Sequence, residues 1–255
     1  MKTIAYPGYH DPDDFEHIHL PEISERSFDT ILFPVCEQTW QFNLDNVRQM
    51  RDVAEDAGYD TWAGPWGLCN MFGGEAISTY KADSPDAEVY LELWKNDLIN
   101  IGFKTVFMDE PQVDCDPDNL VRWFERQRLT TMPEIKLFTS LETSMFDDMS
   151  DDHIRNLPVD SLGLSCYHWR PSASKIMEDT NRWIDRLVTL RPRDNHVWIQ
   201  GFGLPDGDEW VPVLTQSLAQ SAGARDFAHW SFRGTRGTAD KTCVNWRRVW
   251  DNMRG

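Results

Sequence analysis

The chain has 255 residues, a formal net charge of −17 at pH 7 and 12 tryptophans. This length is typical of one domain, so we expect a single domain over residues 1–255. A chain this negative repels phosphate groups, which argues against nucleic acid and against an anionic membrane surface as partners. The sequence has no apolar stretch long enough for a signal peptide or a membrane span, which predicts a cytoplasmic protein.

Short apolar runs recur along the whole chain, and most of them are too short for helices. They are rich in Val, Ile, Phe and Trp, a composition typical of strands that are buried on both faces. We predict eight strands, at residues 3–6, 30–36, 60–63, 105–108, 135–139, 161–166, 197–200 and 226–230.

Amphipathic, helix-like segments fill most of the gaps between these runs. The repeated alternation of strand and helix over 255 residues predicts an α/β protein, a (β/α)8 or TIM barrel. The expected helices lie at residues 44–57, 87–101, 118–129, 173–190, 210–222 and 242–253.

The residues that follow each strand are the candidates for function, because chemistry in such barrels takes place at the carboxyl ends of the strands. In this chain those positions are rich in carboxylates, imidazoles and indoles, which a purely structural barrel does not need. For any one of these side chains, the alternative is that it fills the barrel or covers a loop.

The fourth predicted strand ends in Asp109-Glu110-Pro111. This ending resembles the Asn/Asp-Glu-Pro strand end that holds the acid/base glutamate in many (β/α)8 glycoside hydrolases. The resemblance implies a glycosidase in which Glu110 is the general acid, with Asp109 as its neighbour or as a ligand for sugar hydroxyls. The chemistry itself requires such an acid, because a glycosidic oxygen is a poor leaving group until it is protonated.

The seventh predicted strand departs from the same pattern. In the retaining clan with that fourth-strand motif, the seventh strand ends in a glutamate nucleophile, typically Thr-Glu-Phe-Gly, whereas Gly201 stands at the matching position here. The second catalytic carboxylate must then come from another strand end, and we favour Glu37 or Glu142. A separation of about 5 Å between the two carboxyl groups implies retention, and roughly 6.5–9.5 Å implies inversion.

The abundance of tryptophan favours a carbohydrate ligand, because the apolar faces of sugar rings stack on indoles while polar side chains bind the hydroxyls. We therefore expect a small carbohydrate or glycoside as substrate, and no cofactor. A long segment after the third strand, up to about residue 86, is expected to form a wall of the pocket. The predicted substrate-binding residues are Tyr9, His10, Trp40, Trp66, Glu75, Tyr167, His168, Trp169, Gln200, His229, Trp230 and Arg233.

Two other functions are compatible with the same sequence. His10, His168 and His229 end predicted strands and could, with Glu110 and Glu142, bind a divalent metal, as in sugar isomerase, epimerase or lyase barrels. The missing seventh-strand glutamate also leaves open a barrel that binds carbohydrate without cleaving it.

Two further patterns bear on metal and thiol chemistry. The segment His17-Ile18-His19 resembles the His-x-His motif of metal-dependent amidohydrolases, although it lies beyond the end of the first strand. The five cysteines are widely spaced and include no C-x-x-C pair, so neither a zinc ribbon nor a disulfide framework is predicted. Cys36 and Cys166 close strands, where small buried thiols commonly pack.

Overall fold

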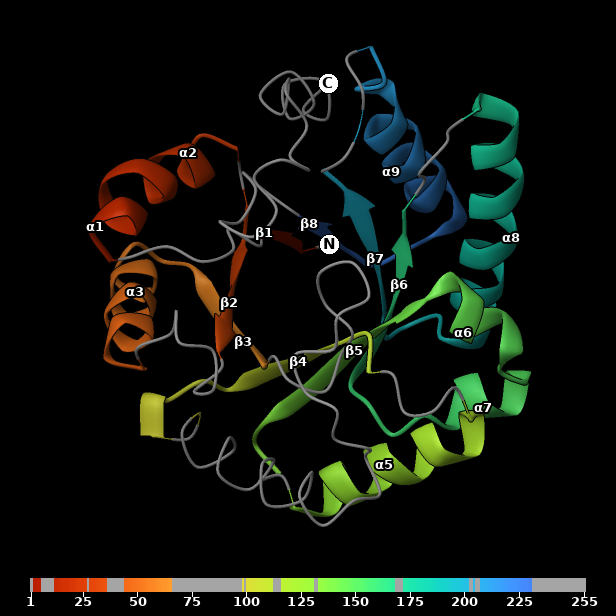
Figure 1. Cartoon of the computed structure of the whole chain (residues 1–255), viewed down its shortest axis with the longest axis horizontal. Coiled ribbons are helices and arrows are strands. Elements are labelled where there is room, and N and C mark those ends of the chain that lie inside the picture. Colours follow the sequence, from red (N-terminus) through yellow and green to blue (C-terminus); the bar gives the residue numbers. More distant parts are fainter. Residues whose placement is uncertain are drawn as a thin grey trace.

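In the computed structural model of this chain, eight parallel strands close into a barrel in chain order, with β1 paired to both β2 and β8 (Figure 1). The predicted (β/α)8 barrel is therefore confirmed. The structure describes residues 2–5, 12–26, 28–35, 44–65, 98, 100–111, 116–130, 133–167, 172–201, 204 and 207–230, with backbone alone for Pro34, Val35, Pro65, Asp109, Thr130 and Trp230. The strands are β1 (Thr3–Ala5), β2 (Thr30–Val35), β3 (Asp60–Pro65), β4 (Thr105–Asp109), β5 (Lys136–Glu142), β6 (Ser161–Cys166), β7 (Asn195–Gln200) and β8 (Asp226–Trp230).

Every predicted strand is present, and the largest difference lies at the end of β5. That strand runs to Glu142, whereas the sequence predicted an end at residue 139. Ser140 and Glu142 interrupt the apolar run, but Ser140 and Leu141 are both buried and pair with β6, so the ladder continues. The extension places Glu142 inside the sheet rather than in the following loop.

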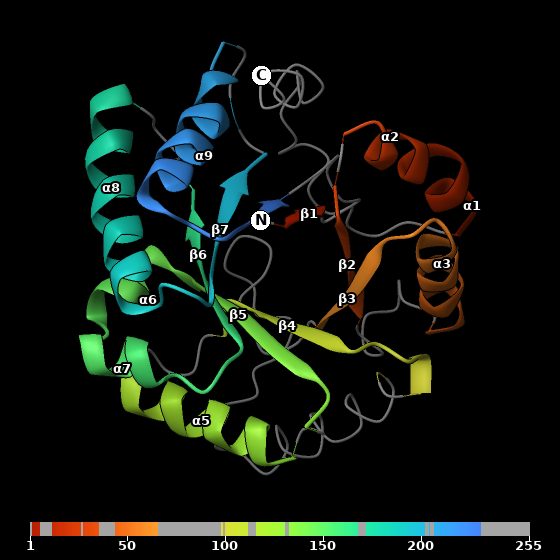
Figure 2. The same ribbon diagram turned by 180° about the vertical axis from the view of Figure 1, so that it is seen from behind.

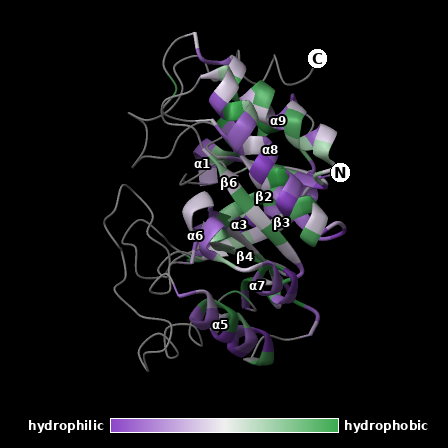
Figure 3. Cartoon of the chain, turned by 90° about the vertical axis from the view of Figure 1, so that its right-hand side faces the viewer, coloured by the Kyte–Doolittle hydropathy of each residue, from purple (hydrophilic) through white to green (hydrophobic). Residues whose placement is uncertain are grey.

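Helices surround the barrel on its outside (Figures 1 and 2). Four of them match predicted helices: α3 (Leu44–Asp56), α5 (Pro117–Thr130), α8 (Ala173–Leu190) and α9 (Trp210–Ala222). Helix α8 buries an apolar stripe towards the barrel and exposes its polar face, and Figure 3 shows apolar and polar residues side by side on the outer helices. Of the helix predicted at 87–101, the described residues 98, 100 and 101 are helical, and the one predicted at 242–253 lies outside the described residues.

Two groups of short helices were not predicted. The first follows β1 and consists of α1 (Pro12–Asp14), the π-helix η1 (Phe15–His19) and α2 (Leu20–Ser24). The second follows β5 and consists of α6 (Thr143–Asp148) and α7 (Asp151–Asn156). Within η1, His17 is exposed and His19 is 5 % exposed, so the two imidazoles lie on different faces of the helix. They cannot share one metal ion, and the hypothesis of an amidohydrolase-like His-x-His site is wrong.

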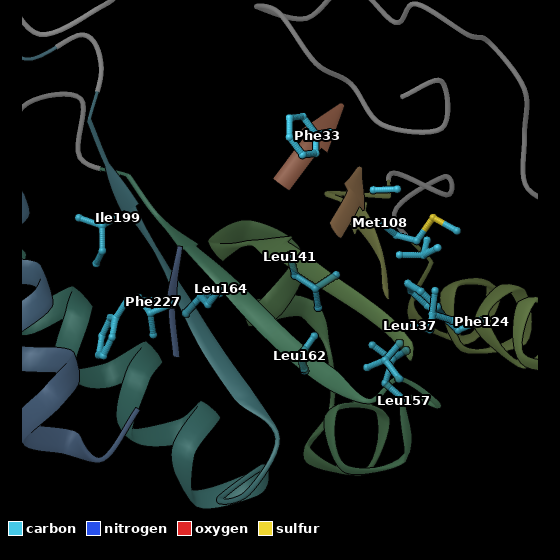
Figure 4. Close-up of a cluster of buried hydrophobic side chains, with 14 of the residues drawn as sticks. Phe33, Met108, Phe124, Leu137, Leu141, Leu157, Leu162, Leu164, Ile199 and Phe227 are labelled. Carbon is cyan, nitrogen blue, oxygen red and sulfur yellow. The ribbon is translucent and has the colours of Figure 1, made fainter. Parts of the chain in front are cut away.

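The strands alternate between two packed regions, one outside and one inside the barrel. Outward side chains such as Phe33, Leu164 and Ile199 form one buried cluster beneath the helices (Figure 4). Inside, the rings of Trp62 and Phe138 lie 4.5 Å apart between centroids. These two residues belong to β3 and β5, which are not neighbours in the sheet, so the contact crosses the barrel interior. The interior is therefore a packed core and not a channel.

A histidine lies inside this core. His196 of β7 is 1 % exposed, and its Nδ1 lies 2.8 Å from the Ser161 hydroxyl oxygen. Its ring stacks on Phe138, with centroids 5.9 Å apart, and lies edge-on to Phe107. The space for the imidazole exists because residue 163 on β6 is glycine: a Cβ built there would lie 2.2 Å from Nε2 of His196.

Gly163→Ala should therefore be strongly destabilising, because the imidazole is held between aromatic rings and cannot move aside. We expect the free energy of unfolding to fall by about 3 kcal/mol, the upper end for overpacking a core, as measured by urea denaturation. Gly64→Ala is a matched control on β3, where the nearest atom to the added Cβ is a Leu32 methyl at 3.3 Å, and we expect it to cost less than about 1 kcal/mol. Equal losses of unfolding free energy in Gly163→Ala and Gly64→Ala would show that the His196 side chain can move away from the added methyl group.

Burial also lowers the pKa of His196 and of His229 on β8 to about 3. Both imidazoles are therefore neutral in the folded protein, whereas in the unfolded chain they take up a proton near pH 6.5. Between pH 6.5 and about 3 the unfolded state binds more protons, so stability should fall with falling pH by about 1.4 kcal/mol per pH unit for each histidine. In urea titrations, His196→Asn should lose stability less steeply over this range than the parent protein. If stability depends on pH equally steeply in His196→Asn and in the parent protein, the His196 imidazole does not stay neutral in the folded state.

Candidate functional site

The carboxyl ends of all eight strands meet at one end of the barrel, because the sheet is parallel and closed. Strand β4 ends at Asp109, whose Cα is paired with Ser140 of β5, and β5 ends at Glu142, paired with Ser165 of β6. Below these ends, the hydroxyls of Ser165 and Ser140 are 3.5 Å apart, with Ser165 as the donor. The predicted carboxylates of β4 and β5 thus lie at the ends of consecutive strands on the same rim.

Glu110 follows β4 directly and has an unusual backbone. Its φ is 39°, and it is the one non-glycine residue with positive φ in the described part of the chain. For a side chain of this size, such a conformation costs on the order of 1–3 kcal/mol, and residues held in this way cluster at functional sites. The strain sets the direction in which the Glu110 side chain leaves the strand end.

Glu110 and Glu142 line a common pocket of about 130 Å³. The walls also include Asp148, which adds a third carboxylate, and none of the lining residues that the structure describes is a lysine, arginine or histidine. Pro111 and Leu141 supply apolar surface beside the strand ends. The described residues that line it are Glu110, Pro111, Leu141, Glu142, Ser144, Met145 and Asp148.

Helix α6 forms the outer wall of this pocket, and α8 holds it in place. The Arg186 guanidinium of α8 donates to the carbonyl oxygens of Phe146 at 2.8 Å and Met149 at 2.5 Å, and lies 5.1 Å from the centroid of the Phe146 ring. The Trp183 indole donates to Asp147 at 3.1 Å. These bonds fix the position of Ser144, Met145 and Asp148 relative to the strand ends.

Three other predicted site residues fall within the described part of the chain. Tyr167 follows β6, is half-buried, and its amide donates to the Ser165 carbonyl at 3.1 Å. Gln200 is the last residue of β7 and is 1 % exposed. His229 is 2 % exposed and packs edge-on against Phe28, with ring centroids 5.6 Å apart. None of the three lines the pocket of Glu110 and Glu142. The His229 ring is buried and packs against Phe28 in this structure.

The remaining predicted site residues are not placed, and their roles stay predictions. For Asp109 and Trp230, the structure gives the backbone position at the ends of β4 and β8. The others lie outside the described residues: Tyr9, His10, Glu37, Trp40, Trp66, Glu75, His168, Trp169 and Arg233.

Ser144, Met145 and Asp148 line the pocket but were not predicted from the sequence. All three belong to α6, and their spacing of three and four residues puts them on one face of the helix. The signal for them was the short polar stretch that follows Glu142, which lacks the length and periodicity of an amphipathic helix. No helix or strand was therefore predicted for that stretch.

Neither a metal cluster nor a reactive thiol is found in the part of the chain that the structure describes. That part holds no group of three or more His, Cys, Asp or Glu residues arranged to bind a metal ion. Cys166 is fully buried, and burial raises the pKa of its thiol to about 12, so it remains protonated and unreactive. Among the described residues, no helix has the length and apolar character needed to cross a membrane.

No protein-family model matches the sequence, and no relative is found among curated protein sequences. Solved structures do match. A chitinase from Chromobacterium violaceum has a TM-score of 0.66 at 12 % identity, covering 99 % of this chain and 98 % of that one. A β-mannanase from Thermomonospora fusca, in complex with mannohexaose, has a TM-score of 0.66 at 13 % identity, covering 99 % and 90 %.

The same fold also occurs with other chemistry. A citrate synthase variant has a TM-score of 0.53 at 10 % identity, covering 89 % of this chain and 84 % of that one. At such identities the likeness shows a shared (β/α)8 fold, so any assignment of function depends on the site.

Proposed function

We propose that this protein is a glycoside hydrolase that cleaves an oligosaccharide or glycoside at the carboxyl end of its barrel. The observation that carries the proposal is that Glu110 and Glu142, from consecutive strand ends, line one pocket. Paired carboxylates are the chemical requirement of most glycosidases. The barrel is also the fold of the chitinase and the mannanase described above.

In this proposal Glu110 is the general acid. It protonates the glycosidic oxygen as the bond breaks, and the positive charge that develops on the sugar is stabilised or captured by a second carboxylate. Glu142 lies in the same pocket, and Glu37 remains the alternative from the sequence. Asp109, the residue before Glu110, is proposed as its neighbour or as a ligand for a sugar hydroxyl.

The aromatic residues predicted at the strand ends would bind the sugar faces, as expected for Trp40, Trp66, Trp169 and Trp230. Sugar hydroxyls would be bound by the polar residues predicted beside them. The reaction proposed needs no cofactor, because proton transfer and charge stabilisation are within reach of carboxylates alone.

A panel of aryl glycosides and natural oligosaccharides, including chitin and mannan fragments, tests the proposal through released reducing sugar. Release by the purified chain, lost on substitution of Glu110, supports it. Binding of an oligosaccharide without release would indicate a non-catalytic barrel. Aldose–ketose interconversion that depends on an added divalent metal would indicate the metal-dependent alternative.

A further inference from the structure

Glu142 occupies the N-cap of α6 but does not cap it. Its backbone is extended, with φ −64° and ψ 151°, and its side chain makes no capping hydrogen bond. Two neighbouring helices show the usual arrangement with the same kind of backbone. Ser150 (φ −70°, ψ 160°) accepts from the His153 amide at the start of α7, and Ser172 accepts from the Lys175 amide at the start of α8.

Glu142 instead lines the pocket that it shares with Glu110 and Asp148. There the Ser144 hydroxyl donates to Oε2 of Glu142 at 3.4 Å. Ser144 is exposed and lies on the first turn of α6, so its hydroxyl has no part in the core. An N-cap bond typically contributes about 0.5–2 kcal/mol, and the Glu142 side chain makes no such bond to α6.

Resting on the function proposed above, we propose that Glu142, rather than Glu37, is the second carboxylate of the reaction, and that Ser144 is its positioning residue. Glu142 then provides the negative charge beside the sugar, as nucleophile or as base, while Glu110 provides the proton. Ser144 restricts the Glu142 side chain to the rotamer that faces the pocket, and its hydroxyl stabilises the carboxylate charge.

Melting temperatures, measured without any substrate, test whether a capping hydrogen bond at position 142 would stabilise α6 and is therefore given up by Glu142. Glu142→Ser places a preferred capping residue on a backbone that suits it, whereas Glu142→Ala makes the same truncation and removes the same charge without a hydroxyl. We expect Glu142→Ser to melt about 1–4 °C above Glu142→Ala. Equal melting temperatures would overturn the argument that Glu142 is diverted from the cap.

The catalytic part is tested with the same two variants on a substrate that the parent protein cleaves. Both should lose at least about 10²-fold in turnover, because the second carboxylate is gone. Sodium azide, a small anion that fits the space left by the truncated side chain, should restore part of the turnover of Glu142→Ala. Near-parental turnover in both variants would overturn the role of Glu142 and favour Glu37.

Ser144 is tested by separating kcat from KM. Ser144→Ala should lower kcat about tenfold, the lower end for a hydrogen bond to a charged group, with KM within about twofold and an unchanged melting temperature. Ser144→Thr keeps the hydroxyl and should recover most of kcat. Thr143→Ala is the matched control on the same turn, because Thr143 does not line the pocket, and its kinetics should be parental. Parental kcat in Ser144→Ala would overturn the positioning role.

These experiments separate the inference from the proposed function. If the parent protein releases no sugar from any glycoside, the glycosidase proposal fails, while the melting comparison still decides whether Glu142 is diverted from the cap. If the parent and Ser144→Ala have equal kcat while Glu110→Gln is inactive, the glycosidase proposal stands and the role of Ser144 fails.

Discussion

Glu110→Gln should lower turnover by at least about 10²-fold on a glycoside with a poor leaving group. The substitution keeps the size of the side chain and removes the proton that the leaving oxygen needs. The loss should be much smaller on an activated aryl glycoside, whose phenolate leaves without protonation. Initial rates on the two substrates, measured with parent and variant, give the ratio that identifies a general acid.

Stability should not account for this loss. Gln and Glu face the same backbone cost at φ 39°, so the melting temperature of the variant should stay within about 2 °C of the parent. Glu125→Gln, on the exposed face of α5, is a matched control with the same chemical change and parental activity. If Glu110→Gln lowers turnover equally on both substrates, or does not lower it at all, another residue donates the proton. The assignment of Glu110 as the general acid from its position at the strand end is then wrong.

The barrel could be predicted because its strands are buried on both faces. Every residue of β6 and β7 is buried, so these strands stand out as short apolar runs in an otherwise charged sequence. Helix α8 was predicted at its observed bounds because it is long, and its buried residues repeat at helical spacing. The short helices after β1 and β5 were missed, since three to six residues are too few to show a period.

The site was predicted in part, for a related reason. Strand ends are visible in the sequence, and this placed Glu110 and Glu142 on one rim. The sequence does not show towards which face of the sheet each side chain points when a strand is buried on both faces. Such a strand is apolar throughout and lacks the alternation of apolar and polar residues that would mark the two faces. His229 follows Ala228 in such a strand, and the fold buries it against Phe28. Ser144 and Asp148 reach the pocket through α6, whose position depends on contacts with α8 that are distant in the sequence.

The largest effect on stability is expected at Arg191, which follows α8 and is 5 % exposed. Its Nη1 donates to the carbonyl oxygens of Ile154 at 3.2 Å, Arg155 at 3.3 Å and Leu157 at 2.9 Å, and its Nη2 donates to that of Val159 at 2.8 Å. The guanidinium also pairs with Asp194. The Arg191 side chain thus provides hydrogen-bond donors for the carbonyl groups at the end of α7 and in the segment that leads into β6.

Arg191→Met should therefore lower the free energy of unfolding by about 3–5 kcal/mol, as for removal of one partner from a buried charged network. Methionine keeps the apolar stem but leaves the carbonyls and Asp194 without their donor, and water reaches this buried position poorly. Urea denaturation measures the loss.

Arg155→Met is the matched control, because Arg155 is about half-exposed and pairs only with Asp151 and Asp152 among the described residues, at 3.9 Å and 3.2 Å. Its removal should change stability by less than about 1 kcal/mol. Similar losses in the two variants would mean that the carbonyls find water or other donors, and that Arg191 does not join α7 and α8 to the barrel.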